Sequence, residues 1–139
     1  GTGSGILGIT ALKLGAKSVL GTDLDENAIC AVAENLEANG IPEGQFQVLQ
    51  GNMIDDERIC GQVGEECYDI AVANILAPVI VLLQGVICRH LKRGGLFIAS
   101  GIINTKEEEV RKAIGENQEL EILEVTYQGD WVSVTARRR

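Results

Sequence analysis

The chain has 139 residues, of which 45% are apolar, and its formal net charge is −8. No apolar run approaches the roughly 18 residues of a membrane-spanning helix, so we expect no membrane partner. The negative charge argues against a nucleic acid as a direct partner, because nucleic-acid binding needs a basic surface. The length suits one domain, and we expect residues 1–139 to form a single one.

The four cysteines are Cys30, Cys60, Cys67 and Cys88, and no two of them have the C-x-x-C spacing of many metal sites. With His90 as the single histidine, the sequence predicts no metal site and no nucleophilic triad. Cys30 and Cys88 fall on apolar faces of predicted helices, where we expect both to be buried. This use of cysteine is typical of a reduced, cytoplasmic protein.

A glycine-rich turn, Gly1-Thr2-Gly3-Ser4-Gly5, begins the sequence and leads directly into an apolar segment. Glycine tolerates positive φ angles and lets a ligand approach the backbone closely. The segment 6–14 has a helical pattern, so the turn should lie where free N–H groups and the positive end of the helix dipole face a ligand. This arrangement favours a nucleotide-like ligand with a carboxylate, a phosphate or a ribose close by.

Two ligand classes fit the spacing of these glycines. Gly1, Gly3 and Gly5 match the G-x-G-x-G of class I methyltransferases, which bind S-adenosylmethionine. Gly3, Gly5 and Gly8 match the G-x-G-x-x-G of domains that bind nicotinamide dinucleotides. Either class needs an acidic residue about 20 residues further on to bind ribose hydroxyls, and Asp23 stands there at the end of a predicted strand.

Strands and helices alternate along the rest of the chain. Their apolar patterns predict strands at 18–23, 46–49, 68–74, 96–100, 120–126 and 131–136, and helices at 4–14, 26–39, 78–91 and 106–117. Asp25 and Thr105 are the expected N-caps of the second and fourth helices. We expect a polar loop over residues 51–66 and a turn at residues 92–95.

The end of the chain decides between two folds. After the last helix, the sequence predicts two strands joined by the hairpin turn Gln128-Gly129-Asp130. A dinucleotide-binding domain would continue with another strand–helix–strand unit, whereas a class I methyltransferase sheet ends in such a hairpin with its last strand antiparallel. We therefore predict an α/β, Rossmann-like fold of the class I S-adenosylmethionine-dependent methyltransferases, with a mostly parallel sheet. The first, central strand of that fold should precede Gly1, so we expect it to be missing from the chain.

Several short stretches together resemble one family. They are residues 1–16, 21–25 (Gly-Thr-Asp-Leu-Asp), 73–77 (Ala-Asn-Ile-Leu-Ala), 93–95 (Arg-Gly-Gly), 100–102 (Ser-Gly-Ile) and 129–132 (Gly-Asp-Trp-Val). With these stretches the whole chain resembles the catalytic domain of the PrmA family, bacterial methyltransferases that modify a large-subunit ribosomal protein. The Asn-Ile-Leu-Ala stretch is the most specific, because relatives that methylate other amino groups often have Asn-Pro-Pro-Tyr in its place.

The resemblance implies that Gly1, Asp23 and Asn74 contact S-adenosylmethionine, and the glycine turn itself adds Gly3 to the cofactor-binding set. It also implies methyl transfer to lysine side chains and an N-terminal amine of a basic ribosomal protein. The amide oxygen of Asn74, at a strand end, can accept an N–H of that amine and orient its lone pair, which makes Asn74 the candidate catalytic residue. The family grips its substrate with a separate N-terminal domain, so we expect residues 1–139 alone to be inactive.

Some alternatives stay open from the sequence. Asn52 and Asp55 follow the second strand, where methyltransferases often contact adenine, but an ordinary surface loop explains both residues as well. The alternative functions are the nicotinamide dinucleotide-binding domain of a dehydrogenase and a methyltransferase-fold scaffold that binds no cofactor.

Overall fold

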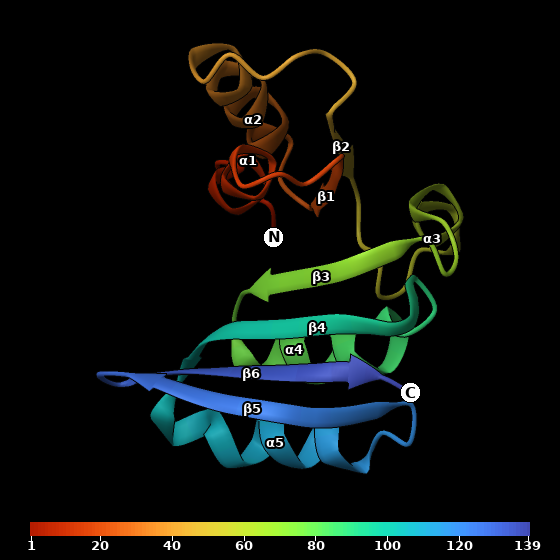
Figure 1. The fold of residues 1–139 in the computed structure, drawn as a ribbon, viewed down its shortest axis with the longest axis vertical. Helices are drawn as coiled ribbons and strands as arrows, with labels where there is room; N and C mark the ends of the chain where they lie inside the picture. Colours follow the sequence, from red (N-terminus) through yellow and green to blue (C-terminus); the bar gives the residue numbers. More distant parts are fainter. The chain divides into compact units, whose positions relative to one another are not determined.

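The computed structural model describes all 139 residues and divides them into two compact units, residues 1–63 (unit 1) and residues 64–139 (unit 2) (Figure 1). Unit 1 contains α1 (Ile6–Lys13), β1 (Val19–Asp23), α2 (Glu26–Ala38), β2 (Phe46–Gln50) and α3 (Glu57–Val63). Unit 2 contains β3 (Tyr68–Asn74), α4 (Ala77–Ile87), β4 (Leu91–Ile103), the short 3-10 helix η1 (Asn104–Lys106), α5 (Glu107–Glu116), β5 (Leu120–Gln128) and β6 (Trp131–Arg138). None of the helices is both long enough and apolar enough to cross a membrane.

The centre of unit 1 is a parallel pair of strands, β1 and β2, in which Val19 lies opposite Phe46 and Asp23 opposite Gln50. Ile9 of α1, Val32 of α2 and Phe46 form its buried apolar cluster. Both strands therefore end at the same edge of the sheet, and Asp23 lies at that edge.

Gly8 of α1 lets this helix approach the strands closely. A Cβ atom at Gly8 would lie 2.2 Å from the ring of Phe46 and 2.8 Å from a methyl carbon of Val19. Both distances are shorter than any ordinary carbon–carbon contact, so only glycine fits here. The third glycine of the G-x-G-x-x-G pattern thus packs α1 against β1 and β2.

The N-terminus of α2 confirms a prediction from the sequence. Asp25 is its N-cap, and the Asp25 carboxylate accepts the backbone N–H of Asn27 at 2.9 Å. Glu26 in the first turn adds a negative charge where the helix dipole favours one.

The sheet of unit 2 has the strand order β3-β4-β6-β5. β3 and β4 are parallel, and β6 lies between β4 and β5, antiparallel to both. This is the predicted C-terminal hairpin with its last strand inserted antiparallel. Figure 1 shows α4 and α5 side by side on one face of this sheet. The fully buried core takes its side chains from both layers, with Ile80 and Ile114 from the helices and Phe97, Ile102 and Val134 from the strands.

The predicted polar loop over residues 51–66 is wrong in part, because it contains α3. The buried side chains of this helix are Ile59, Cys60 and Val63, which share one face at helical spacing. The Asp56 carboxylate accepts the backbone N–H of Arg58 at 3.0 Å, which supports the first turn.

Two further boundaries differ from the prediction. α4 ends at Ile87, and residues 92–95 belong to β4 instead of a turn. Thr105 lies in η1, and the N-cap of α5 is Lys106, which makes no capping hydrogen bond with its side chain. Of the two cysteines predicted to be buried, Cys88 is buried, but Cys30 is exposed.

Candidate cofactor-binding site

One carbonyl group of β1 accepts several hydrogen bonds from the glycine-rich turn. The carbonyl oxygen of Thr22 accepts the Thr2 N–H at 3.1 Å, the Thr2 hydroxyl at 2.9 Å and the Gly1 nitrogen at 2.6 Å. Gly21 leaves the room for this contact, since a Cβ atom there would lie 2.4 Å from the Thr2 hydroxyl oxygen. The turn therefore lies against the carboxyl end of β1.

The Asp23 carboxylate joins the turn to the start of α2. Its Oδ2 accepts the backbone N–H of Gly3 at 2.9 Å, and its Oδ1 accepts the backbone N–H of Asp25 at 3.0 Å. The Asp23 side chain is only 15% exposed. Gly1, Gly3 and Asp23, which the sequence singled out, thus lie together in unit 1.

These contacts keep Asp23 ionised. Burial by itself would raise the pKa of the Asp23 carboxyl, but the N–H groups of Asp25 and Gly3 stabilise the charged form and hold the pKa below its usual range. Each carboxylate oxygen keeps further lone-pair capacity beside the hydrogen bond it already accepts. Asp23 can therefore hold the turn and still accept hydroxyl groups of a ligand.

The N-terminus of α1 is open to an anionic or polar group. Gly5 is its N-cap, with a φ of +83°, and no side chain caps the helix. The first turn contains no acidic residue, while Gly3 and Ser4 are exposed. The positive end of the dipole of α1 is thus left uncompensated beside the glycine turn.

Asn74, the candidate catalytic residue, lies in unit 2. It is the last residue of β3, pairs with Ser100 of β4 and is exposed. No hydrogen bond within the chain engages its side-chain amide. Leu76 then begins α4 as its N-cap, with Pro78 in the first turn.

The two candidates for an adenine contact behave differently. The Asn52 side chain accepts the backbone N–H of Ile54 at 2.9 Å and so shapes its own loop. Asp55 is exposed. For Asn52 the structure favours the surface-loop interpretation.

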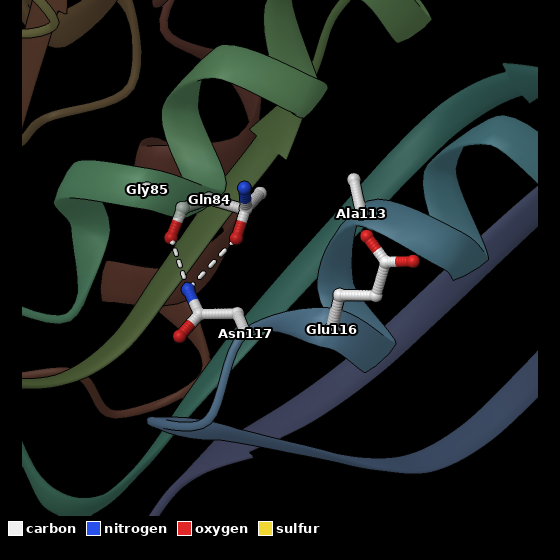
Figure 2. A pocket seen from close by; sticks show the side chains of 5 residues that line it. All are labelled: Gln84, Gly85, Ala113, Glu116 and Asn117. Atoms are coloured by element: carbon white, nitrogen blue, oxygen red, sulfur yellow. Dashed lines mark hydrogen bonds between the residues drawn. The ribbon is translucent and has the colours of Figure 1, made fainter.

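A hollow of about 420 Å³ between α4 and α5 contains none of the predicted site residues. Figure 2 shows the Asn117 amide pointing at Gln84, where it donates to the Gln84 backbone oxygen at 2.9 Å and to the side-chain oxygen at 2.7 Å. The Asn117 side-chain oxygen in turn accepts the N–H of Glu119 at 2.9 Å. These polar groups satisfy one another and brace the two helices.

Comparison with known proteins decides the family. A family model described as ribosomal protein L11 methyltransferase (PrmA) matches residues 1–139. The chain belongs to the PrmA family. A ribosomal protein L11 methyltransferase of Lachnospira eligens is 54% identical over 139 residues, which are 100% of this chain and 44% of that protein. The chain thus spans less than half the length of this PrmA relative.

Solved structures agree on the fold. A ribosomal protein L11 methylase from Lactobacillus delbrueckii subsp. bulgaricus matches with a TM-score of 0.87 and 35% identity, over 100% of this chain and 67% of that one. A methyltransferase solved as a complex with SAH has a TM-score of 0.76 at 16% identity, over 96% of this chain and 42% of that one. The PrmA chain therefore has the class I methyltransferase fold, as its sequence predicted.

Three structural details around the predicted site residues were not found from the sequence. The Thr22 carbonyl and the room at Gly21 hold the glycine turn, and both residues stand in the Gly-Thr-Asp-Leu-Asp stretch at 21–25, where a role in the site was predicted for Asp23 alone. Gly101 lies against Asn74 and stands in the Ser-Gly-Ile stretch at 100–102, which was noted without a role.

Proposed function

We propose that residues 1–139 form the catalytic domain of an S-adenosylmethionine-dependent protein N-methyltransferase. Its substrate is ribosomal protein L11, and the methylated groups are lysine side chains and an N-terminal amine, in the cytoplasm. The family match, which spans both units, and the Lachnospira relative support this proposal. The net charge of −8 supports a basic protein partner, because opposite charge accelerates association.

The observation that carries the proposal is the Asp23 carboxylate bound to the Gly3 N–H at the carboxyl end of β1. This contact supports the proposal, because it holds an ionised carboxylate, which can accept ribose hydroxyls, against a turn with little side-chain bulk that leads into α1. This donor and acceptor set fits S-adenosylmethionine, which has a ribose and a carboxylate. When bound, this cofactor supplies a methyl group already activated on a positively charged sulfur.

The chain's own task is to hold and orient the substrate amine. A lysine with an ordinary pKa of about 10.4 must first lose a proton, because only the neutral amine has a lone pair to attack with. We assign the Asn74 amide oxygen to accept an N–H of that amine and so direct its lone pair, while solvent takes the proton. Such orientation is a large part of the rate that an enzyme can supply when the donor is already reactive.

Substitution of Asp23 tests the proposal. In the full-length enzyme, Asp23→Ala should weaken S-adenosylmethionine binding about 10- to 150-fold, since a hydrogen bond to a charged group contributes about 1.5–3 kcal/mol. Asp23→Asn keeps the shape of the side chain and loses its charge, so its affinity for S-adenosylmethionine should lie between those of the wild type and Asp23→Ala. Titration calorimetry measures both affinities. Glu34→Ala, which removes an exposed carboxylate of α2, is the matched control and should bind as the wild type does.

The same titration separates the alternative functions. A dehydrogenase domain would bind NADH in preference to S-adenosylmethionine, and a cofactor-free scaffold would bind neither. Unchanged affinity in Asp23→Ala would show that Asp23 is not a cofactor ligand.

A further inference from the structure

The Asn74 side chain lies beside a glycine of the neighbouring strand. Gly101 follows Ser100, the register partner of Asn74, and has a φ of +72°. A Cβ atom on Gly101 would lie 2.0 Å from the Asn74 side-chain oxygen and 3.2 Å from its amide carbon. The Asn74 amide therefore occupies the space that any side chain at residue 101 would need.

The path of β4 creates this space. The register between β4 and β6 shifts between Ala99 and Ile102, so Ser100 and Gly101 form an irregularity in the strand. Gly94, in the same strand, also has a positive φ of +81°, but nothing lies within 4 Å of where its Cβ would be. Backbone conformation is thus a sufficient reason for glycine at residue 94, whereas residue 101 has a second, independent reason.

We propose that Gly101 is a positioning residue for methyl transfer, because its missing side chain provides the seat for the Asn74 amide. This inference rests on the proposed function, in which Asn74 orients the substrate amine. No hydrogen bond within the chain holds the Asn74 amide, and the terminal torsion of an asparagine has a broad preference. The space left by Gly101 then lets the amide take the orientation seen in the structure, which a side chain at residue 101 would block.

A methyl group at residue 101 would force the amide of Asn74 to turn away. Since Asn74 is exposed, its side chain can rotate into solvent, and the protein should still fold. The orientation of the amide is lost instead, and a misplacement of about 1 Å at a reacting centre can reduce the rate 100-fold.

The experiment compares Gly101→Ala with Gly94→Ala in the full-length enzyme. Both variants place alanine at a positive φ in β4, so both should lower Tm to a similar extent. Gly101→Ala should in addition lower kcat about 10- to 100-fold, with little change in the S-adenosylmethionine affinity, while Gly94→Ala keeps the kcat of the wild type. Equal kcat in the two variants would overturn the proposal.

A second arm uses the Asn74→Ala background. There the clash is gone, so adding Gly101→Ala should cause no further loss of kcat. A loss of the same factor in both backgrounds would show that Gly101 does not act through Asn74. If Asn74→Ala alone leaves kcat unchanged, the role proposed for Asn74 fails, which is distinguishable from a failure at Gly101 alone.

Discussion

The two units of the chain are held together in different ways. Unit 2 has a four-stranded sheet, and all the apolar side chains with no exposed surface, such as Phe97 and Ile114, lie in it. Unit 1 has a two-stranded sheet and a small cluster around Val32 and Phe46. Its order around the glycine turn comes from polar contacts, made by the Thr22 carbonyl and the Asp23 carboxylate.

The surroundings of the predicted site residues differ between the two units in the same way. Unit 1 holds its glycine turn by hydrogen bonds to the neutral Thr22 carbonyl and to the charged Asp23 carboxylate, and only the hydrogen bond to Asp23 depends on the protonation of a side chain. In unit 2, the Asn74 amide has no hydrogen bond within the chain and lies where a side chain at residue 101 would be. The stability of the glycine turn in unit 1 should therefore depend on the charge of Asp23 and on pH. The stability of unit 2 should depend on the volume of its buried side chains.

The largest effect is expected from Phe97→Ala in β4. Phe97 is fully buried, and removing such a ring costs about 3–5 kcal/mol of the free energy of unfolding. Urea unfolding followed by the fluorescence of Trp131, the single tryptophan, measures the change in unit 2. The control is Leu82→Ala, at a side chain of α4 that is 61% exposed and should change stability by no more than about 0.5 kcal/mol. A similar loss of unfolding free energy in the two variants would contradict the conclusion that buried packing holds unit 2 together.

A smaller effect is expected from Gly8→Ala in unit 1. Alanine is the better helix former, but its Cβ would overlap the ring of Phe46, and overpacking of this kind costs about 1–3 kcal/mol. Gly61→Ala in α3 is the control, because nothing lies within 4 Å of its Cβ and the substitution should stabilise by up to about 1 kcal/mol. Circular dichroism during thermal unfolding gives both values. Opposite signs are the expected result, and a shared sign would contradict the tight packing of α1.

The smallest effect is expected in the pH dependence of stability that Asp23 contributes. The pKa of Asp23 is lower in the folded chain than its ordinary value of 3.8. Ionised Asp23 therefore stabilises the fold above pH 3.8, and this contribution is lost as the pH falls from there through the lower, folded pKa. Denaturant unfolding at several pH values should show the wild type more stable than Asp23→Asn near neutrality, with the difference shrinking in acid. A difference that does not depend on pH would show that the charge of Asp23 has no part in holding the turn.

Much of the fold could be read from local patterns. Four strands begin at the predicted residue: Phe46, Tyr68, Leu120 and Trp131. α3 was missed because its apolar face is only three residues long and is surrounded by polar residues. The boundary between α4 and β4 was misplaced because Leu91 continues the helical spacing from Ile87, and because Gly94 and Gly95 after two basic residues are typical of a turn.

In the candidate site, too, contacts that follow from a local motif could be predicted, whereas a contact that depends on strand register could not. Asp23 and Gly3 were recognised because a motif places a carboxylate at a known distance after a glycine turn, and they do meet in the structure. The contact of Asn74 with Gly101 could not be found in this way. It depends on the register of β3 against β4 and on a shift within β4, neither of which leaves a mark in the sequence.

Each unit has one exposed and one buried cysteine, Cys30 and Cys60 in unit 1 and Cys67 and Cys88 in unit 2. The thiolate is the reactive form of cysteine. Burial raises the pKa of Cys88 to about 11, so this thiol stays protonated and inaccessible while unit 2 is folded. An alkylating reagent should modify Cys30 and Cys67 at once and should reach Cys60 or Cys88 only when the surrounding structure opens. The chain thus contains a separate chemical reporter of unfolding in each half, which mass spectrometry of the alkylated peptides can follow over time.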